Sequence, residues 1–113
     1  MMIKMKKLRL ICKKIPAIEV FNSYSMSKTN IKVEKVAKEL KLGGTGGSDA
    51  HEVIHVGYGY TIIEDMDLNV DSILSEIQRK RTWGEGKILP LDVRRDRMIK
   101  AIKDFFRRGL RKI

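Results

Sequence analysis

The sequence predicts a small α/β protein with a short, mostly parallel sheet and covering helices. Three observations predict it. Short β-branched segments alternate with segments of helical period. Glycine-rich connections lie between them. The length of 113 residues, 42% of them hydrophobic, suits one domain with one modest core. We expect residues 1–113 to form a single domain with the order α-β-α-β-β-α-(β)-α.

The first half of the chain predicts two helices around one strand. Residues 4–14 have apolar side chains near helical spacing, and Pro16 ends that helix. Residues 18–22 alternate and are rich in β-branched and aromatic types, which is typical of a strand. The clearest helix follows, and we expect Gly43 to close it. Its apolar face is Val33, Val36, Ala37 and Leu40. Its candidate N-caps are Ser27, Thr29 and Asn30.

The second half of the chain is rich in glycine, so its predicted strands are short. The stretch 43–51 admits only a short strand, and residues 58–63 predict another. Asn69 is expected to cap a helix over about 70–77. Residues 82–90 predict a loop with room for one last short strand. The tail from residue 94 predicts a basic amphipathic helix with one apolar stripe, which we expect to lie in the core. That stripe is Met98, Ile102, Phe105 and Phe106.

The net charge of +10 is concentrated at the two ends. Residues 1–14 carry +6 and residues 94–113 carry +7, whereas residues 15–93 carry −3. Basic ends could bind phosphate backbones, although charge runs more often form a solvated face. No apolar run approaches the roughly 20 residues of a membrane helix, and no secretory signal is recognisable. The single cysteine, Cys12, favours a reducing, cytoplasmic setting.

Residues 51–55 read His-Glu-Val-Ile-His, the HExxH pattern of zinc proteases. That chemistry needs both imidazoles on one face of a helix. Glycines crowd both sides of this segment, and the chain has no third histidine. A protease is therefore an unfavoured alternative, and we expect His55 to be a surface or loop histidine. The glycine pattern also lacks the third glycine of a dinucleotide site and the GK[ST] of a P-loop.

Four strings resemble the C-terminal part of PHP domains, the polymerase and histidinol phosphatase family. They are IEVFN (18–22), VAKELKL (36–42), GGSDAH (46–51) and VGYGYT (56–61), and the resemblance covers about residues 8–90. Such domains are distorted (β/α) barrels that hold two or three divalent metals and hydrolyse phosphoesters. The resemblance therefore implies a partial (β/α) barrel-like layer and a metal-dependent phosphoesterase.

The family's last metal motif, Asp-x-His, maps onto Asp49 and His51. The resemblance makes these two residues the expected ligands of a divalent Zn, Mn or Fe ion. A carboxylate and an imidazole just past a strand also suit the mouth where barrel sites form. Gly46 and Gly47 are expected to let the backbone approach a phosphate or a metal-bound water. Asn22 and Ser48 are the candidate substrate-proximal residues, and a turn-forming role for Asn22 is equally open.

The family's earlier His-bearing motifs are absent, because no histidine precedes His51. Two ligands are fewer than the three protein ligands common in catalytic zinc sites. We therefore expect no catalytic residue of its own and an incomplete hydrolase for a phosphoester. Its missing ligands would come from a second copy of the chain or from a partner chain with the N-terminal barrel half. The alternative is a non-catalytic nucleic-acid-binding or scaffold module, and we expect no membrane partner.

Overall fold

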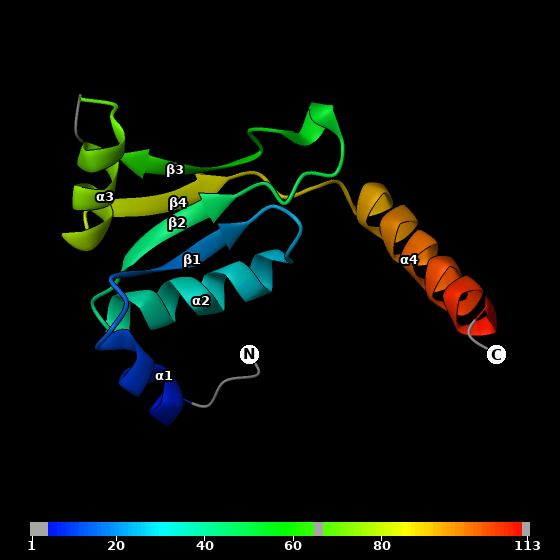
Figure 1. The fold of residues 1–113 in the computed structure, drawn as a ribbon, viewed down its shortest axis with the longest axis horizontal. Coiled ribbons are helices and arrows are strands. Elements are labelled where there is room, and N and C mark those ends of the chain that lie inside the picture. Colours follow the sequence, from blue (N-terminus) through cyan, green and yellow to red (C-terminus); the bar gives the residue numbers. More distant parts are fainter. Residues whose placement is uncertain (1–4, 65–66, 112–113) are drawn as a thin grey trace.

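The computed structural model describes residues 5–64 and 67–111 and shows a mixed α/β arrangement (Figure 1). Its elements follow the predicted order and include the optional last strand. They are α1 (Met5–Cys12), β1 (Ala17–Asn22), α2 (Ser27–Glu39), β2 (Gly43–Gly47), the 3-10 turn η1 (Val53–His55), β3 (Gly59–Ile63), α3 (Val70–Gln78), β4 (Thr82–Gly86) and α4 (Leu91–Arg111).

The described strands form two pairs rather than one continuous sheet. β1 and β2 are parallel, joined by α2 as their crossover, whereas β3 and β4 are antiparallel. The prediction of a mostly parallel sheet therefore holds for the first pair only. Within residues 5–64 and 67–111, these strands do not close into a barrel.

The glycines of β2 bring the two strand pairs into direct backbone contact. A Cβ atom at Gly46 would collide with the Tyr60 carbonyl oxygen, and one at Gly84 would collide with the Thr45 carbonyl oxygen. Two hydroxyls link the pairs. Thr61 Oγ1 accepts from Gly46 N at 3.0 Å, and Thr82 Oγ1 donates to the Gly44 carbonyl at 2.8 Å. The missing side chains of β2 therefore make room for protein backbone.

The core lies between α2 and the strands, as the periodicity of α2 predicts. Val20, Ala37 and Leu42 are buried. The partly buried side chains packed against them are Ile18, Val33, Leu40 and Trp83. This is a small core even for a chain of this size, so few apolar contacts support the fold.

The helix ends agree only in part with the predicted caps. Asn69 caps α3 as predicted, because its side chain accepts from Ser72 N at 2.8 Å. The N-cap of α2 is Met26, which makes no side-chain capping bond. Gly43 does not close α2 either, since Lys41 takes the left-handed conformation with φ 55°. Gly43 opens β2 instead, where a Cβ would lie 3.0 Å from Lys80 Cα.

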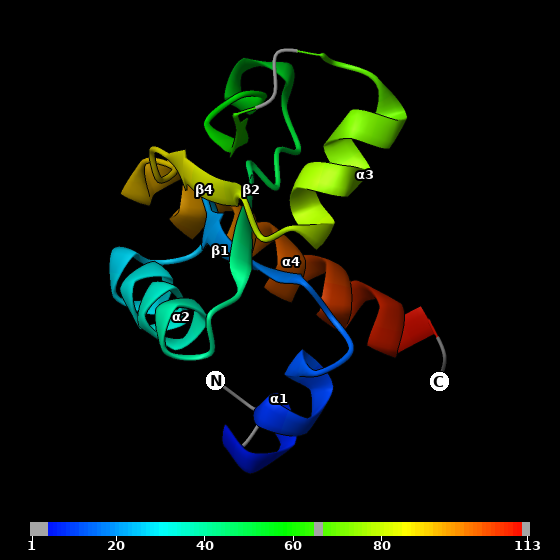
Figure 2. The same ribbon diagram turned by 90° about the vertical axis from the view of Figure 1, so that its left-hand side faces the viewer.

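Helix α4 projects away from the strands (Figure 1), and in the turned view it lies behind them (Figure 2). Its predicted apolar stripe is exposed rather than in the core, with Phe105 72% and Phe106 62% accessible. The radius of gyration is 16.9 Å, compared with about 13 Å for a compact chain of this length. The prediction of a core-facing stripe is wrong, because α4 leaves the strands and its stripe faces solvent instead of the core. The described helices include none that is both long and apolar enough to traverse a bilayer.

Gly46→Ala should lower the free energy of unfolding by about 1–3 kcal/mol, because its Cβ meets fixed backbone on β3 and β4. Gly109→Ala is the matched control, since a Cβ there meets nothing within 4 Å and alanine favours helix. Urea denaturation of both variants measures the difference. An unchanged midpoint for Gly46→Ala would show that the two strand pairs are not in contact.

Candidate functional site

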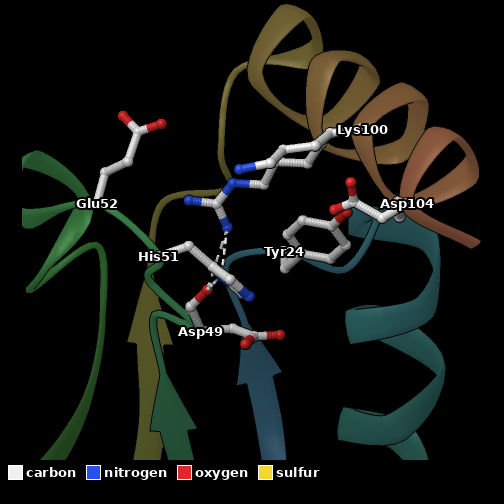
Figure 3. A pocket seen from close by; sticks show the side chains of 8 residues that line it. Tyr24, Asp49, His51, Glu52, Lys100 and Asp104 are labelled. Carbon is white, nitrogen blue, oxygen red and sulfur yellow. Dashed lines mark hydrogen bonds between the residues drawn. The ribbon is translucent and has the colours of Figure 1, made fainter. Parts of the chain in front are cut away.

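A pocket opens where the carboxyl ends of β1 and β2 meet α4 (Figure 3). The parallel register pairs Asn22 with Gly47, so the loops that follow both strands leave the same edge. The cavity measures about 620 Å³. Its lining residues are Tyr24, Asp49, His51, Glu52, Arg97, Lys100, Ala101 and Asp104.

Both predicted metal ligands line this pocket. Asp49 is exposed, and its backbone takes the left-handed conformation with φ 50°, which aspartate tolerates better than most residues. Among the described residues, the Asp49 carboxylate has no hydrogen-bond partner. His51, also exposed, places Nδ1 2.9 Å from the Asp49 carbonyl oxygen. The turn therefore brings the two side chains to one pocket, as the motif predicts.

Arg97 of α4 holds the imidazole of His51. Its Nη1 lies 2.6 Å from His51 Nδ1 and 3.4 Å from the Asp49 carbonyl oxygen. A guanidinium only donates, so Nδ1 accepts from Arg97 and the ring proton resides on Nε2. In this arrangement Nδ1 does not donate to the Asp49 carbonyl, despite the short distance.

Asn22 and Ser48 lie at the same edge but do not line the pocket. Asn22 Oδ1 accepts from Tyr24 N at 2.8 Å, and its amide donates to Glu19 Oε2 at 3.2 Å. Ser48 Oγ accepts from Ala50 N at 3.3 Å. Both side chains thus shape the loops that carry the pocket residues, and a contact with substrate stays a prediction for each.

The predicted purpose of Gly46 and Gly47 is wrong. The space beside Gly46 is filled by the backbone of β3 and β4. A Cβ at Gly47 would lie 2.7 Å from Glu19 Oε1. Protein atoms therefore occupy the room that the sequence assigned to a phosphate or a metal-bound water.

The HExxH segment does not form the helix that a zinc protease requires. Glu52 is extended, and only Val53–His55 forms a 3-10 turn. His51 is exposed, whereas His55 is 2% accessible and packs edge-on against Tyr58, with ring centroids 5.2 Å apart. The prediction of a surface histidine at position 55 is therefore wrong, and the two imidazoles do not share a face.

The sequence interpretation missed the contribution of α4. Arg97, Lys100, Ala101 and Asp104 follow the spacing i, i+3, i+4, i+7, so one helix face lines the pocket. That periodicity was available in the sequence, but the apolar stripe on another face of the helix dominated the interpretation. Tyr24 was also missed. Its ring lies 5.7 Å from the Arg97 guanidinium carbon and 6.3 Å from the His51 ring.

Asn30 fixes the end of β1 from the first turns of α2. It is buried, its Oδ1 accepts from Asn22 N at 3.1 Å, and its Nδ2 donates to the Asn22 carbonyl at 3.1 Å. The sequence suggested Asn30 only as a helix cap. Its actual role is to satisfy both backbone groups of a residue at the edge of the site.

The donor set fits a divalent metal only in part. An exposed carboxylate and an imidazole are suitable ligands, but His51 would first have to lose its bond from Arg97. Nδ1 could then bind the metal directly, or it could take up the ring proton so that Nε2 binds instead. Within the described part of the chain, no three His, Cys, Asp or Glu residues come together as a metal site. Asp49 and His51 alone therefore supply two ligands.

The fold and pocket define a small α/β domain with a polar site at the carboxyl edge of its parallel strands. Residues 28–82, just under half of the chain, match the family model described as PHP-associated. This match confirms the resemblance to PHP domains over a shorter range than the 8–90 predicted. It contains Asp49 and His51 and stops before α4. No curated protein and no solved structure matches the chain.

Asn30→Ala should lower the free energy of unfolding by about 1–3 kcal/mol, because the backbone groups of Asn22 lose their buried partner. Thr29→Ala, an exposed neighbour on α2, is the control and should change it little. Denaturant unfolding gives the stability, and amide exchange at Asn22 gives the local effect. Slow exchange at Asn22 in the Asn30→Ala variant would contradict the assigned role.

Proposed function

We propose that this chain is the closing portion of a PHP-type (β/α) barrel and that Asp49 and His51 are its metal ligands. The carrying observation is that this Asp-x-His motif falls inside the PHP-associated segment and lines one pocket at the carboxyl end of β2. The single cysteine in the sequence supports a reducing, cytoplasmic setting for it.

The reaction we propose is hydrolysis of a phosphoester. A bound Zn, Mn or Fe ion would activate water and neutralise phosphoryl oxygens. The chain's own residues would hold the ion and orient the substrate. Asp49 offers a carboxylate that pairs with none of the described residues, and His51 offers an imidazole. Asn22 and Ser48 keep their loops in shape near the substrate.

Asp49 and His51 supply only two of the proposed metal ligands, so we propose that another chain supplies the remaining ligands. It is either a second copy or a partner that supplies the N-terminal barrel half. The small core and the exposed stripe of α4 support association. Each leaves surface that a further element would cover.

Asp49→Ala should weaken binding of Mn or Zn at least about tenfold, because it removes one of two ligands. Glu52→Gln is the matched control, since Glu52 lines the same pocket but is not a proposed ligand. Metal titration of the dialysed protein measures affinity, and aryl phosphate hydrolysis measures any turnover. Equal affinity in wild type and Asp49→Ala would remove the metal proposal. Loss of aryl phosphate hydrolysis in Glu52→Gln but not in Asp49→Ala would show that turnover depends on Glu52 rather than on the proposed ligand.

The exposed aromatic pair of α4 favours one second candidate, a nucleic-acid-binding module. Phe105 and Phe106 contact each other edge-on at 5.9 Å, and both are exposed next to Arg107 and Arg108. Exposed rings among cations can stack on bases while the cations bind phosphates. Such binding should weaken steeply as salt rises, measured by oligonucleotide titration. A flat salt dependence would dismiss this candidate.

A further inference from the structure

We propose that Arg97 and Lys100 of α4 form a binding site for a single phosphate group, borne by a phosphomonoester or free in solution. This site goes beyond the metal proposal, because neither residue is a proposed metal ligand and no metal is needed. It also lies outside the PHP-associated segment. Both residues line the pocket drawn in Figure 3, in which Lys100 is labelled.

The Arg97 guanidinium is held in place yet has unused hydrogen-bonding capacity. Nη1 contacts His51 and the Asp49 carbonyl, and the Tyr24 ring lies 5.7 Å from the guanidinium carbon. Nη2 is shielded from solvent and has no hydrogen-bond partner among the described residues. A buried donor without a partner is unfavourable, so an acceptor that reaches it is favoured.

A small rotation of the guanidinium would let a phosphate engage that donor. The rotation would give up both contacts of Nη1, the 2.6 Å bond to His51 Nδ1 and the long 3.4 Å contact with the Asp49 carbonyl, and both of these acceptors are neutral. Two parallel bonds from one guanidinium to one phosphate are stronger than neutral hydrogen bonds. The exchange therefore favours the phosphate-bound arrangement.

Lys100 supplies the second cation. It lies one helical turn after Arg97 on the same face of α4, and Figure 3 shows its side chain extending toward the loop of His51 and Glu52. It is exposed and forms no ion pair among the described residues. Two like charges at this spacing repel each other, and an anion between them removes that repulsion.

The acidic lining restricts the ligand to a small one. Glu52 and Asp104 lie on opposite sides of the pocket in Figure 3, and neither forms an ion pair with Arg97 or Lys100. A polyanion would bring several phosphates against these carboxylates, which is unfavourable. A small polar or cationic molecule that bears one phosphate matches both the cations and the carboxylates of the pocket, and it suits the cavity of about 620 Å³.

Phosphate binding should also change His51. Once Arg97 turns toward the ligand, His51 Nδ1 loses its donor and can itself donate to the Asp49 carbonyl, 2.9 Å away. The ring proton then moves from Nε2 to Nδ1. The sequence has only two histidines, so ring-nitrogen NMR can follow this change.

The test is a titration of the full chain with inorganic phosphate and with phenyl phosphate, in chelator to exclude metal. Arg97→Gln and Lys100→Gln should each weaken binding at least about tenfold, as charge-assisted hydrogen bonds of this kind predict. Lys103→Gln is the matched control, because it removes the same charge from α4 outside the pocket. Equal affinity for both ligands would show that the phosphate alone is recognised. Tighter binding of phenyl phosphate would show that the group attached to the phosphate also contributes.

The proposal is overturned if wild type does not bind phosphate, or if Lys103→Gln weakens binding as much as Lys100→Gln. Lys100 is exposed, so its variant remains informative even if Arg97→Gln unfolds the chain. A shift of the His51 ring-nitrogen signals on phosphate addition, lost in Arg97→Gln, is the second expected readout. Because metal is absent throughout, failure of the Asp49 metal prediction leaves this result unaffected.

Discussion

The contact between the bare backbone of β2 and the β3–β4 pair governs the rest of this structure. Two peptide backbones approach this closely only where side chains are missing, and glycines on both sides meet that requirement. The hydroxyls of Thr61 on β3 and Thr82 on β4 then donate to the Gly46 and Gly44 carbonyls of β2. The contact fixes the direction of β2 and hence the position of the Asp49 turn.

Close backbone packing has an energetic consequence. Glycine strands bury little apolar area, so the hydrophobic term rests on a few side chains from α2 and β1 together with Leu42 and Trp83. A domain with so small a core has little stability to spare. The exposed stripe of α4 adds apolar surface that water must cover. The small core and the exposed stripe both favour the association with another chain that we propose.

The pocket combines two kinds of group that phosphoester chemistry uses. Carboxylate and imidazole come from the turn after β2, and guanidinium and ammonium come from α4. They are linked, because Arg97 occupies His51 Nδ1. A cation thus already lies beside the two proposed ligands, and what happens to Arg97 decides which nitrogen of His51 is available. Helix α4 is therefore part of the site rather than a solvated appendage.

Local sequence determined the elements of this protein. The period of Val33 to Leu40, the Asn69 cap and the Asp49-x-His51 motif each involve neighbours a few residues apart, so they can be predicted without the fold. Tertiary structure alone decided what fills the space beside Gly46, which face of α4 lines the pocket and that His55 is buried. The physical reason is that these depend on surfaces distant in the chain, and a glycine does not reveal whether backbone or ligand will occupy the room it leaves.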